Sequence, residues 1–169
     1  MKKILLFLSV ILLTSGGLFA QEVAEKKANV FSVGAGFSGI VKTSLVVGYE
    51  HMLTKSLFND KTSLGLGVDF LYGKQTSDFH SCTKYVPTLK LNMYYQLGSH
   101  VDAYVGAQAG CAFMKDSPRN GGFMDGTHQN ISWGAYVGVR YFFMGNFGVY
   151  AQAGYNPLSY ASAGLAFRF

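Results

Sequence analysis

The chain has 169 residues, enough for one domain of ordinary size, with 15% aromatic residues, 21 glycines and only 14% charged residues. Soluble proteins carry about 25% charged residues, so this composition argues against a surface that faces water throughout. The formal net charge is +5, and the basic residues are scattered along the chain rather than clustered. We therefore expect no nucleic-acid partner.

Residues 1–20 have the three-part pattern of a secretory signal peptide. Two lysines precede an apolar run over 4–13, and small residues lead up to Ala20. We expect cleavage after Ala20, followed by a short polar periplasmic lead-in at 21–27 and a membrane barrel over 28–169. The apolar run is too short for a spanning helix, which needs about 20 residues.

From residue 28 onward, apolar residues alternate with small or polar ones at a period of two, and no helical period competes. Eight segments show this alternation: 31–38, 44–50, 63–73, 84–97, 101–113, 131–143, 147–155 and 161–169. Tilted strands of about 8 to 12 residues cross a bilayer, and an even number of them closes without an edge. The sequence therefore predicts an all-β fold, an eight-stranded antiparallel up-and-down transmembrane β-barrel.

The connections between these segments differ in length. Tight turns are expected at 98–100 and 144–146, and longer loops at 74–83 and 115–128. Short turns on one rim and longer loops on the other are typical of outer-membrane barrels. The loop at 115–128 is the best candidate for contact with an extracellular partner, although a solvated connection is the favoured interpretation because the loop has no binding motif.

The apolar face of the segments carries aromatic residues at two levels, with Val, Leu and Ala between them. The first level contains Phe37, Phe70, Tyr72, Tyr85, Phe113, Trp133 and Tyr155. The second contains Tyr95, Tyr141, Phe143, Phe147, Phe167 and Phe169. Two aromatic belts around an aliphatic band indicate a wall that faces lipid rather than the apolar interior of a soluble barrel.

The opposite, mixed face would line a narrow lumen, and it carries six charged residues. These are Glu50, Asp69, Lys90, Asp102, Arg140 and Arg168. Because an isolated buried charge is costly, we predict a paired polar network among them. Asp102 and Arg140 lie opposite each other if their segments are neighbours, so we expect this pair to form.

The stretch "VGAGFSG" contains Gly34, Gly36 and Gly39 in the G-x-G-x-x-G spacing of a dinucleotide-binding turn. That motif needs a helix after it, and here another alternating segment follows. Gly34 and Gly36 share the lumen face, where we expect them to leave space for larger side chains. No cofactor is predicted, and the histidines and cysteines lack a metal-ligand spacing. Whether Cys82 and Cys111 form a disulfide stays open, because their positions are offset along the strands.

The closing "AGLAFRF", with Leu165, Phe167 and Phe169 on one face, resembles the C-terminal strand of Gram-negative outer-membrane barrels. With the eight alternating segments, the chain is similar to the OmpA/OmpX-type barrel domains. This resemblance implies a location in the cell outer membrane and contact with its lipid and lipopolysaccharide. It also implies that Leu165, Phe167 and Phe169 form an assembly signal read by the barrel-assembly machinery.

The same architecture includes enzymes that modify lipid A. A deacylase of this kind would need the motif H-x-S on the lipid face of a strand. No H-x-S occurs, and His51 is better explained as a histidine at headgroup depth. An eight-stranded barrel is usually too narrow to conduct solutes, although Pro87 could mark a lateral gap for small apolar molecules. We predict a structural or interaction role without catalysis, in envelope integrity, adhesion or lipopolysaccharide contact. A lipid A-modifying enzyme and a narrow pore or lateral transporter are the alternatives.

Overall fold

A computed structural model describes residues 29–38, 43–54, 61–76, 80–118 and 126–169 of the chain. The predicted signal peptide and lead-in lie outside these residues, so both stay predictions. Within the described ranges, no helix is long and apolar enough to cross a membrane.

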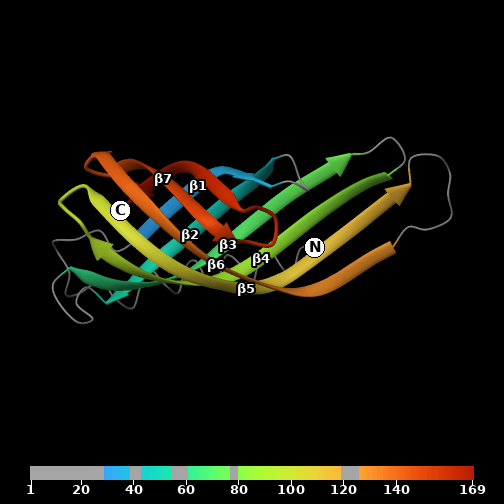
Figure 1. Cartoon of the computed structure of the whole chain (residues 1–169), viewed down its shortest axis with the longest axis horizontal. Helices are drawn as coiled ribbons and strands as arrows, with labels where there is room; N and C mark the ends of the chain where they lie inside the picture. The colour runs from blue at the N-terminus through green and yellow to red at the C-terminus, as the bar shows by residue number, and fades with distance from the viewer. Residues whose placement is uncertain (1–28, 39–42, 55–60, 77–79, 119–125) are drawn as a thin grey trace.

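Eight strands form a closed antiparallel barrel in which each strand pairs with its neighbours in chain order (Figure 1). They are β1 (Asn29–Phe37), β2 (Ser44–Thr54), β3 (Thr62–Thr76), β4 (His80–Gln96), β5 (Val101–Pro118), β6 (Gly126–Met144), β7 (Phe147–Tyr155) and β8 (Ala161–Arg168). This arrangement confirms the predicted fold class. Period-two alternation was enough to predict the strands because successive side chains of each strand point alternately to the lumen and to the outside of the barrel.

The barrel closes where the last strand meets the first. β1 and β8 are antiparallel, with Val33 opposite Leu165. Just beyond the strand ends, the backbone N–H groups of Asn29 and Phe169 each donate to the other residue's carbonyl, at 3.1 and 3.0 Å. Closure leaves neither β1 nor β8 as an open edge, which a sheet in lipid could not tolerate.

Four strands are longer than the sequence predicted. β3, β4, β5 and β6 have 15, 17, 18 and 19 residues, so the loops expected at 74–83 and 115–128 are largely paired ladder. The prediction was wrong because it followed the apolar alternation, which stops at the edge of the membrane. Backbone pairing needs no apolar face and continues beyond it, from Lys74 opposite Thr83 to Lys115 opposite Thr127.

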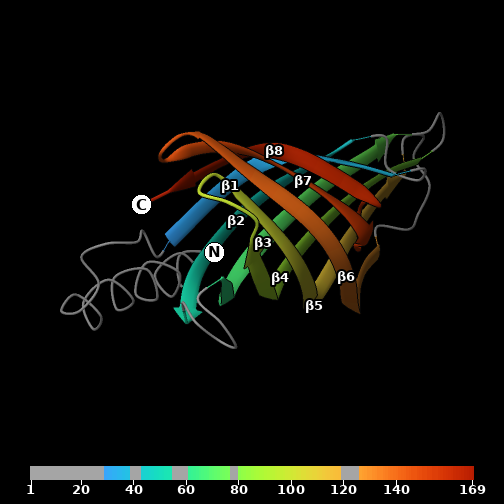
Figure 2. The same ribbon diagram turned by 60° about the vertical axis from the view of Figure 1, so that its left-hand side comes forward.

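The long strands extend past their neighbours at one end of the barrel, opposite the end where β8 finishes (Figures 1 and 2). The turns at 97–100 and 145–146 lie on the same rim as the start of β1 and the end of β8. We call this the terminal rim and the opposite one the outer rim. Gly145 adopts a positive φ of 60° in its two-residue turn, a conformation that favours glycine.

The interior is packed in layers rather than hollow. An apolar cluster lies toward the outer rim and contains Val46, Leu71, Val86, Ala112 and Leu158. A second cluster lies toward the terminal rim and contains Val30, Phe142, Tyr150 and Ala166. Buried polar and charged side chains lie between them, and their arrangement forms the candidate site.

Candidate functional site

Four of the six predicted lumen charges meet in the middle of the barrel. The Lys90 Nζ atom lies 2.7 Å from Asp69 Oδ1 and 3.6 Å from Glu50 Oε2. The Arg140 Nη2 atom lies 2.8 Å from the same Glu50 oxygen. Each of these four residues is at least nine-tenths buried, and two positive charges balance two negative ones. This neutrality is what makes such deep burial tolerable.

Amide and phenol groups complete the arrangement around Glu50. Asn92 Nδ2 donates to Glu50 Oε2 at 3.1 Å, and the Tyr94 hydroxyl donates to Glu50 Oε1. Tyr136 in turn donates to Asn92 Oδ1 at 2.8 Å. We call these three residues and the four charges the lumen network. Sequence reasoning missed Asn92, Tyr94 and Tyr136 as members, although each lies on the lumen face of its strand.

The Arg140 guanidinium is held partly by aromatic faces. Its Cζ atom lies 5.0 Å from the ring centroid of Tyr94 and 4.9 Å from that of Tyr104. Among the described residues, its Nε and Nη1 atoms have no hydrogen-bond partner. Cation–π contact in a desolvated site replaces part of that missing stabilisation. Arg140 is therefore fixed by Glu50 on one atom and by two tyrosine rings around it.

The two remaining predicted charges lie outside this group. Asp102 is half-buried and stands opposite Arg140 in the β5–β6 ladder, as the sequence register predicted. The Arg140 guanidinium contacts Glu50, a residue of β2. Arg168 lies at the terminal rim, where its Nε donates to the Gly145 carbonyl at 2.6 Å and its Cζ lies 4.2 Å from the Phe142 ring centroid.

The lumen glycines Gly34 and Gly36 leave room for side chains of other strands and of the β7–β8 connection. A Cβ atom placed on Gly36 would lie 2.5 Å from Ser44 Oγ and 2.8 Å from Ser159 Oγ. One placed on Gly34 would lie 2.5 Å from the Tyr150 hydroxyl. Both are closer than van der Waals contact allows. The structure thus agrees with the interpretation of "VGAGFSG" as space for larger side chains.

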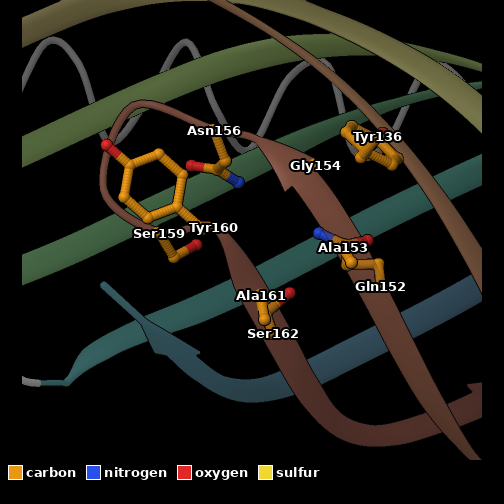
Figure 3. A pocket seen from close by; sticks show the side chains of 9 residues that line it. All are labelled: Tyr136, Gln152, Ala153, Gly154, Asn156, Ser159, Tyr160, Ala161 and Ser162. Atoms are coloured by element: carbon orange, nitrogen blue, oxygen red, sulfur yellow. The ribbon is translucent and has the colours of Figure 1, made fainter. Parts of the chain in front are cut away.

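The connection between β7 and β8, which contains Asn156, Ser159 and Tyr160, lies at the outer rim (Figure 3). Leu158 of this connection inserts into the outer apolar cluster, and its backbone N–H donates to Asn156 Oδ1 at 3.2 Å. The Tyr160 N–H donates to the Phe37 carbonyl at 2.9 Å, which ties the connection to the end of β1. A pocket of about 100 Å³ beside it is lined in part by Lys84. Ligand sites usually have about 300 to 1,000 Å³, so this pocket is too small for a typical ligand.

The outer face of the barrel is apolar and exposed. The exposed large side chains include Val105, Val137 and Val139 between the ends of the strands, with Trp133 and Tyr141 nearer the two rims. The predicted belts are visible as ring contacts near each rim, 5.1 Å between the Trp133 and Tyr155 centroids and 4.9 Å between those of Phe147 and Phe167. A wall of this kind is stable in lipid and not in water.

His51 belongs to a small polar cluster on this outer face, near the terminal rim. Its Nδ1 atom lies 2.8 Å from Asn29 Oδ1, and the Tyr49 hydroxyl donates to the same oxygen at 2.9 Å. Glu50, its neighbour in sequence, points into the lumen and contacts Arg140 instead. The position matches the expected histidine at the membrane interface. In the described part of the chain, no group of three His, Cys, Asp or Glu residues could hold a metal ion.

No disulfide joins Cys82 and Cys111, a question that the sequence left open. In the β4–β5 ladder, Cys82 stands opposite Asp116 rather than Cys111. The offset of five residues corresponds to about 17 Å along a strand, far beyond the reach of a disulfide. The two side chains also lie on opposite faces of the sheet, Cys82 on the lumen face and Cys111 on the outer face.

Three solved structures share this fold. The N-terminal β-barrel domain of Pseudomonas aeruginosa OprF matches with a TM-score of 0.59 and 16% identity, over 86% of this chain and 100% of that one. Yersinia pestis Ail, the attachment invasion locus protein, gives 0.54 and 15%, over 86% and 100%. Neisserial surface protein A gives 0.55 and 19%, over 85% and 95%. No family model and no curated protein sequence matches the chain. The fold is that of the small eight-stranded outer-membrane β-barrels.

Proposed function

We propose that this protein is an integral outer-membrane barrel with a structural and interaction role, carried out at its outer end and outer wall, and without catalysis. The observation that carries the proposal is the contrast between a closed lumen and a sheet that extends beyond the membrane. The packed lumen argues against a pore, and the extended outer end supports an interaction role.

The packed lumen argues against the pore alternative. Apolar clusters lie on both sides of the lumen network, and Leu71 and Val86 of the outer cluster are fully buried. A conducting path would require the four paired charges and both clusters to rearrange. The lateral alternative keeps one point in its favour, because the β4–β5 ladder is unpaired at Val86 and Pro87, although the β3–β4 ladder stays in register there, with Pro87 opposite Phe70.

The outer end offers a surface for a partner. The β6–β7 ladder ends at Ala135 opposite Tyr155, whereas β6 begins at Gly126. We call residues 126–134 the β6 edge, since no strand of the barrel pairs with them on that side. Ile131 on this segment is 88% exposed. An unpaired edge with exposed apolar side chains is a template for an added strand from another protein. We place adhesion here rather than at a loop tip.

Two further partners belong to this proposal. Lipid and lipopolysaccharide would surround the apolar wall. The barrel-assembly machinery would read the end of β8, where Phe167 and Phe169 stack with ring centroids 5.7 Å apart on the outer face. A lipid A-modifying enzyme receives no such support, because the sequence has no H-x-S and the hydrogen bond described for His51 is to Asn29.

Shortening the β5–β6 hairpin tests the proposed role. Replacing residues 111–131 with an Asn-Gly turn between the ladder partners Gly110 and Ser132, which suits a two-residue hairpin, removes the paired outer ends of both strands and most of the β6 edge, including Ile131. We expect cells that express this variant to lose adherence to a host-cell monolayer while the barrel keeps its heat-dependent gel shift. The matched control replaces only 119–125 and leaves the ladder intact, so it should keep full adherence. Equal loss in both variants would assign binding to the loop tip, and adherence by both would contradict the proposal.

Catalysis has a separate test. The lipid A mass profile of a deletion strain should match that of its parent. An altered acyl pattern that is restored by the gene would overturn the non-catalytic assignment.

A further inference from the structure

Two exposed lysines from different strands meet in one row on the outer face. In the β3–β4 ladder Lys74 stands opposite Thr83, and in the β4–β5 ladder Thr83 stands opposite Lys115. Both lysines are exposed and Thr83 is half-buried. We call these three residues the lysine row. Because one strand separates the lysines, their backbones lie about 10 Å apart.

An aromatic row lies directly beside the lysine row, on the membrane side. It consists of Tyr72, Tyr85 and Phe113, which are partners across the same three strands. The Tyr72 and Tyr85 ring centroids are 5.3 Å apart. Aromatic belts mark the headgroup level of a bilayer. The lysine row is two residues further out, about 7 Å along the strand, at the level where phosphate and sugar groups begin.

The charge of the lysine row is not compensated by the described protein. Glu50, Asp69 and Asp102 all occupy lumen-side positions, and the first two are paired there. Among the described residues, neither Lys74 nor Lys115 forms an ion pair with a carboxylate. The other described strand lysines, Lys84 and Lys90, lie on the lumen face. The outward-facing positive charge of the strands is therefore concentrated at the outer rim, above the aromatic belt.

We propose that the lysine row binds the phosphate groups of lipopolysaccharide in the outer leaflet. The two ammonium groups would contact the anionic sugar phosphates, with the Thr83 hydroxyl available to donate between them, while the aromatic row packs against the acyl chains below. This inference rests on the outer-membrane placement given above. It adds a phosphate-binding site for the lipopolysaccharide already proposed as a partner, and it uses a surface other than the β6 edge.

Binding of purified, refolded protein to lipopolysaccharide in detergent tests the site. We expect the K74Q/K115Q variant to bind about 30-fold more weakly than the wild type, since each lysine near an anionic lipid surface contributes about a fivefold effect. The wild type should bind dephosphorylated lipopolysaccharide as weakly as the variant binds the phosphorylated form. Its affinity should also fall as salt is raised, because exposed charges are screened.

The K61Q variant is the matched control, because Lys61 is exposed at the terminal rim and its replacement changes the net charge in the same direction. It should bind like the wild type. Equal binding by K74Q/K115Q and the wild type, or equal binding of both lipopolysaccharide forms by the wild type, would overturn the site. So would equally tight binding of phosphatidylglycerol micelles, which would show attraction to any anionic lipid. The K74Q/K115Q variant keeps the β6 edge, so cells that express it should adhere like the wild type even though lipopolysaccharide binding is weakened. The two proposals therefore fail independently.

Discussion

The lumen face and the outer face of the barrel alternate along every strand, yet they are built from different chemistry. The lumen face buries four charged side chains in ion pairs and leaves glycine wherever a tyrosine or serine comes close. The outer face exposes valine, leucine and aromatic rings, and its two described lysines lie beyond the aromatic belt. A water-soluble barrel would reverse this distribution. The difference teaches that each face is fitted to its own surroundings: lipid outside and a desolvated polar core inside.

Removing one member of the lumen network should have the largest effect on stability. Arg140→Met leaves the buried Glu50 carboxylate with less positive charge nearby, and we expect a loss of about 3 to 5 kcal/mol in the free energy of unfolding. Urea unfolding of the refolded protein in detergent micelles measures it. The double variant E50Q/R140M should lose less than the sum of the single variants. Additive losses would mean that the two residues are not coupled.

A charged residue introduced on the outer face at mid-membrane depth should lower the free energy of unfolding nearly as much as loss of a lumen-network residue. Val137 lies in the middle of β6 on the lipid side, and Val137→Lys should cost about 2 to 4 kcal/mol in bilayers. Val137→Leu is the matched control and should be close to neutral. If the lysine variant is as stable as the leucine variant, the outer face does not contact hydrocarbon at that depth.

Filling the space at a lumen glycine should cost somewhat less, provided that the barrel still closes. Gly36→Leu forces a side chain against Ser44 and Ser159, and overpacking typically costs about 1 to 3 kcal/mol. Ala35→Leu, one residue away on the outer face, should leave stability and the heat-dependent gel shift unchanged. Normal folding yields for both variants would contradict the assignment of faces in β1.

The smallest expected effect concerns the thiols. Because Cys82 and Cys111 lie on opposite faces, the intact mass should be the same with and without reductant. The melting temperature should not change on reduction either. A mass that rises on reduction by that of two hydrogen atoms would contradict the β4–β5 register.

The sequence predicted the number of strands, their order and the two faces, because each of these follows from local alternation. It could not predict where β3–β6 end, since the polar residues beyond the membrane carry no periodic signal. It also did not predict that Arg140 contacts Glu50: the ladder neighbour Asp102 follows from strand order, whereas Glu50 lies across the lumen on β2. Contacts across the lumen depend on the curvature of the closed barrel, which the sequence of a single strand does not predict.

Trp133 allows the most direct test, because it is the only tryptophan in the sequence and is 64% exposed on the outer face near the outer rim. Its fluorescence in bilayers of brominated phospholipids reports contact with acyl chains. We predict strong quenching, greatest when the bromines lie near the headgroup end of the chains, and little quenching by aqueous iodide. Quenching by iodide with none by brominated lipid would place this face in water and contradict the assignment of the outer wall.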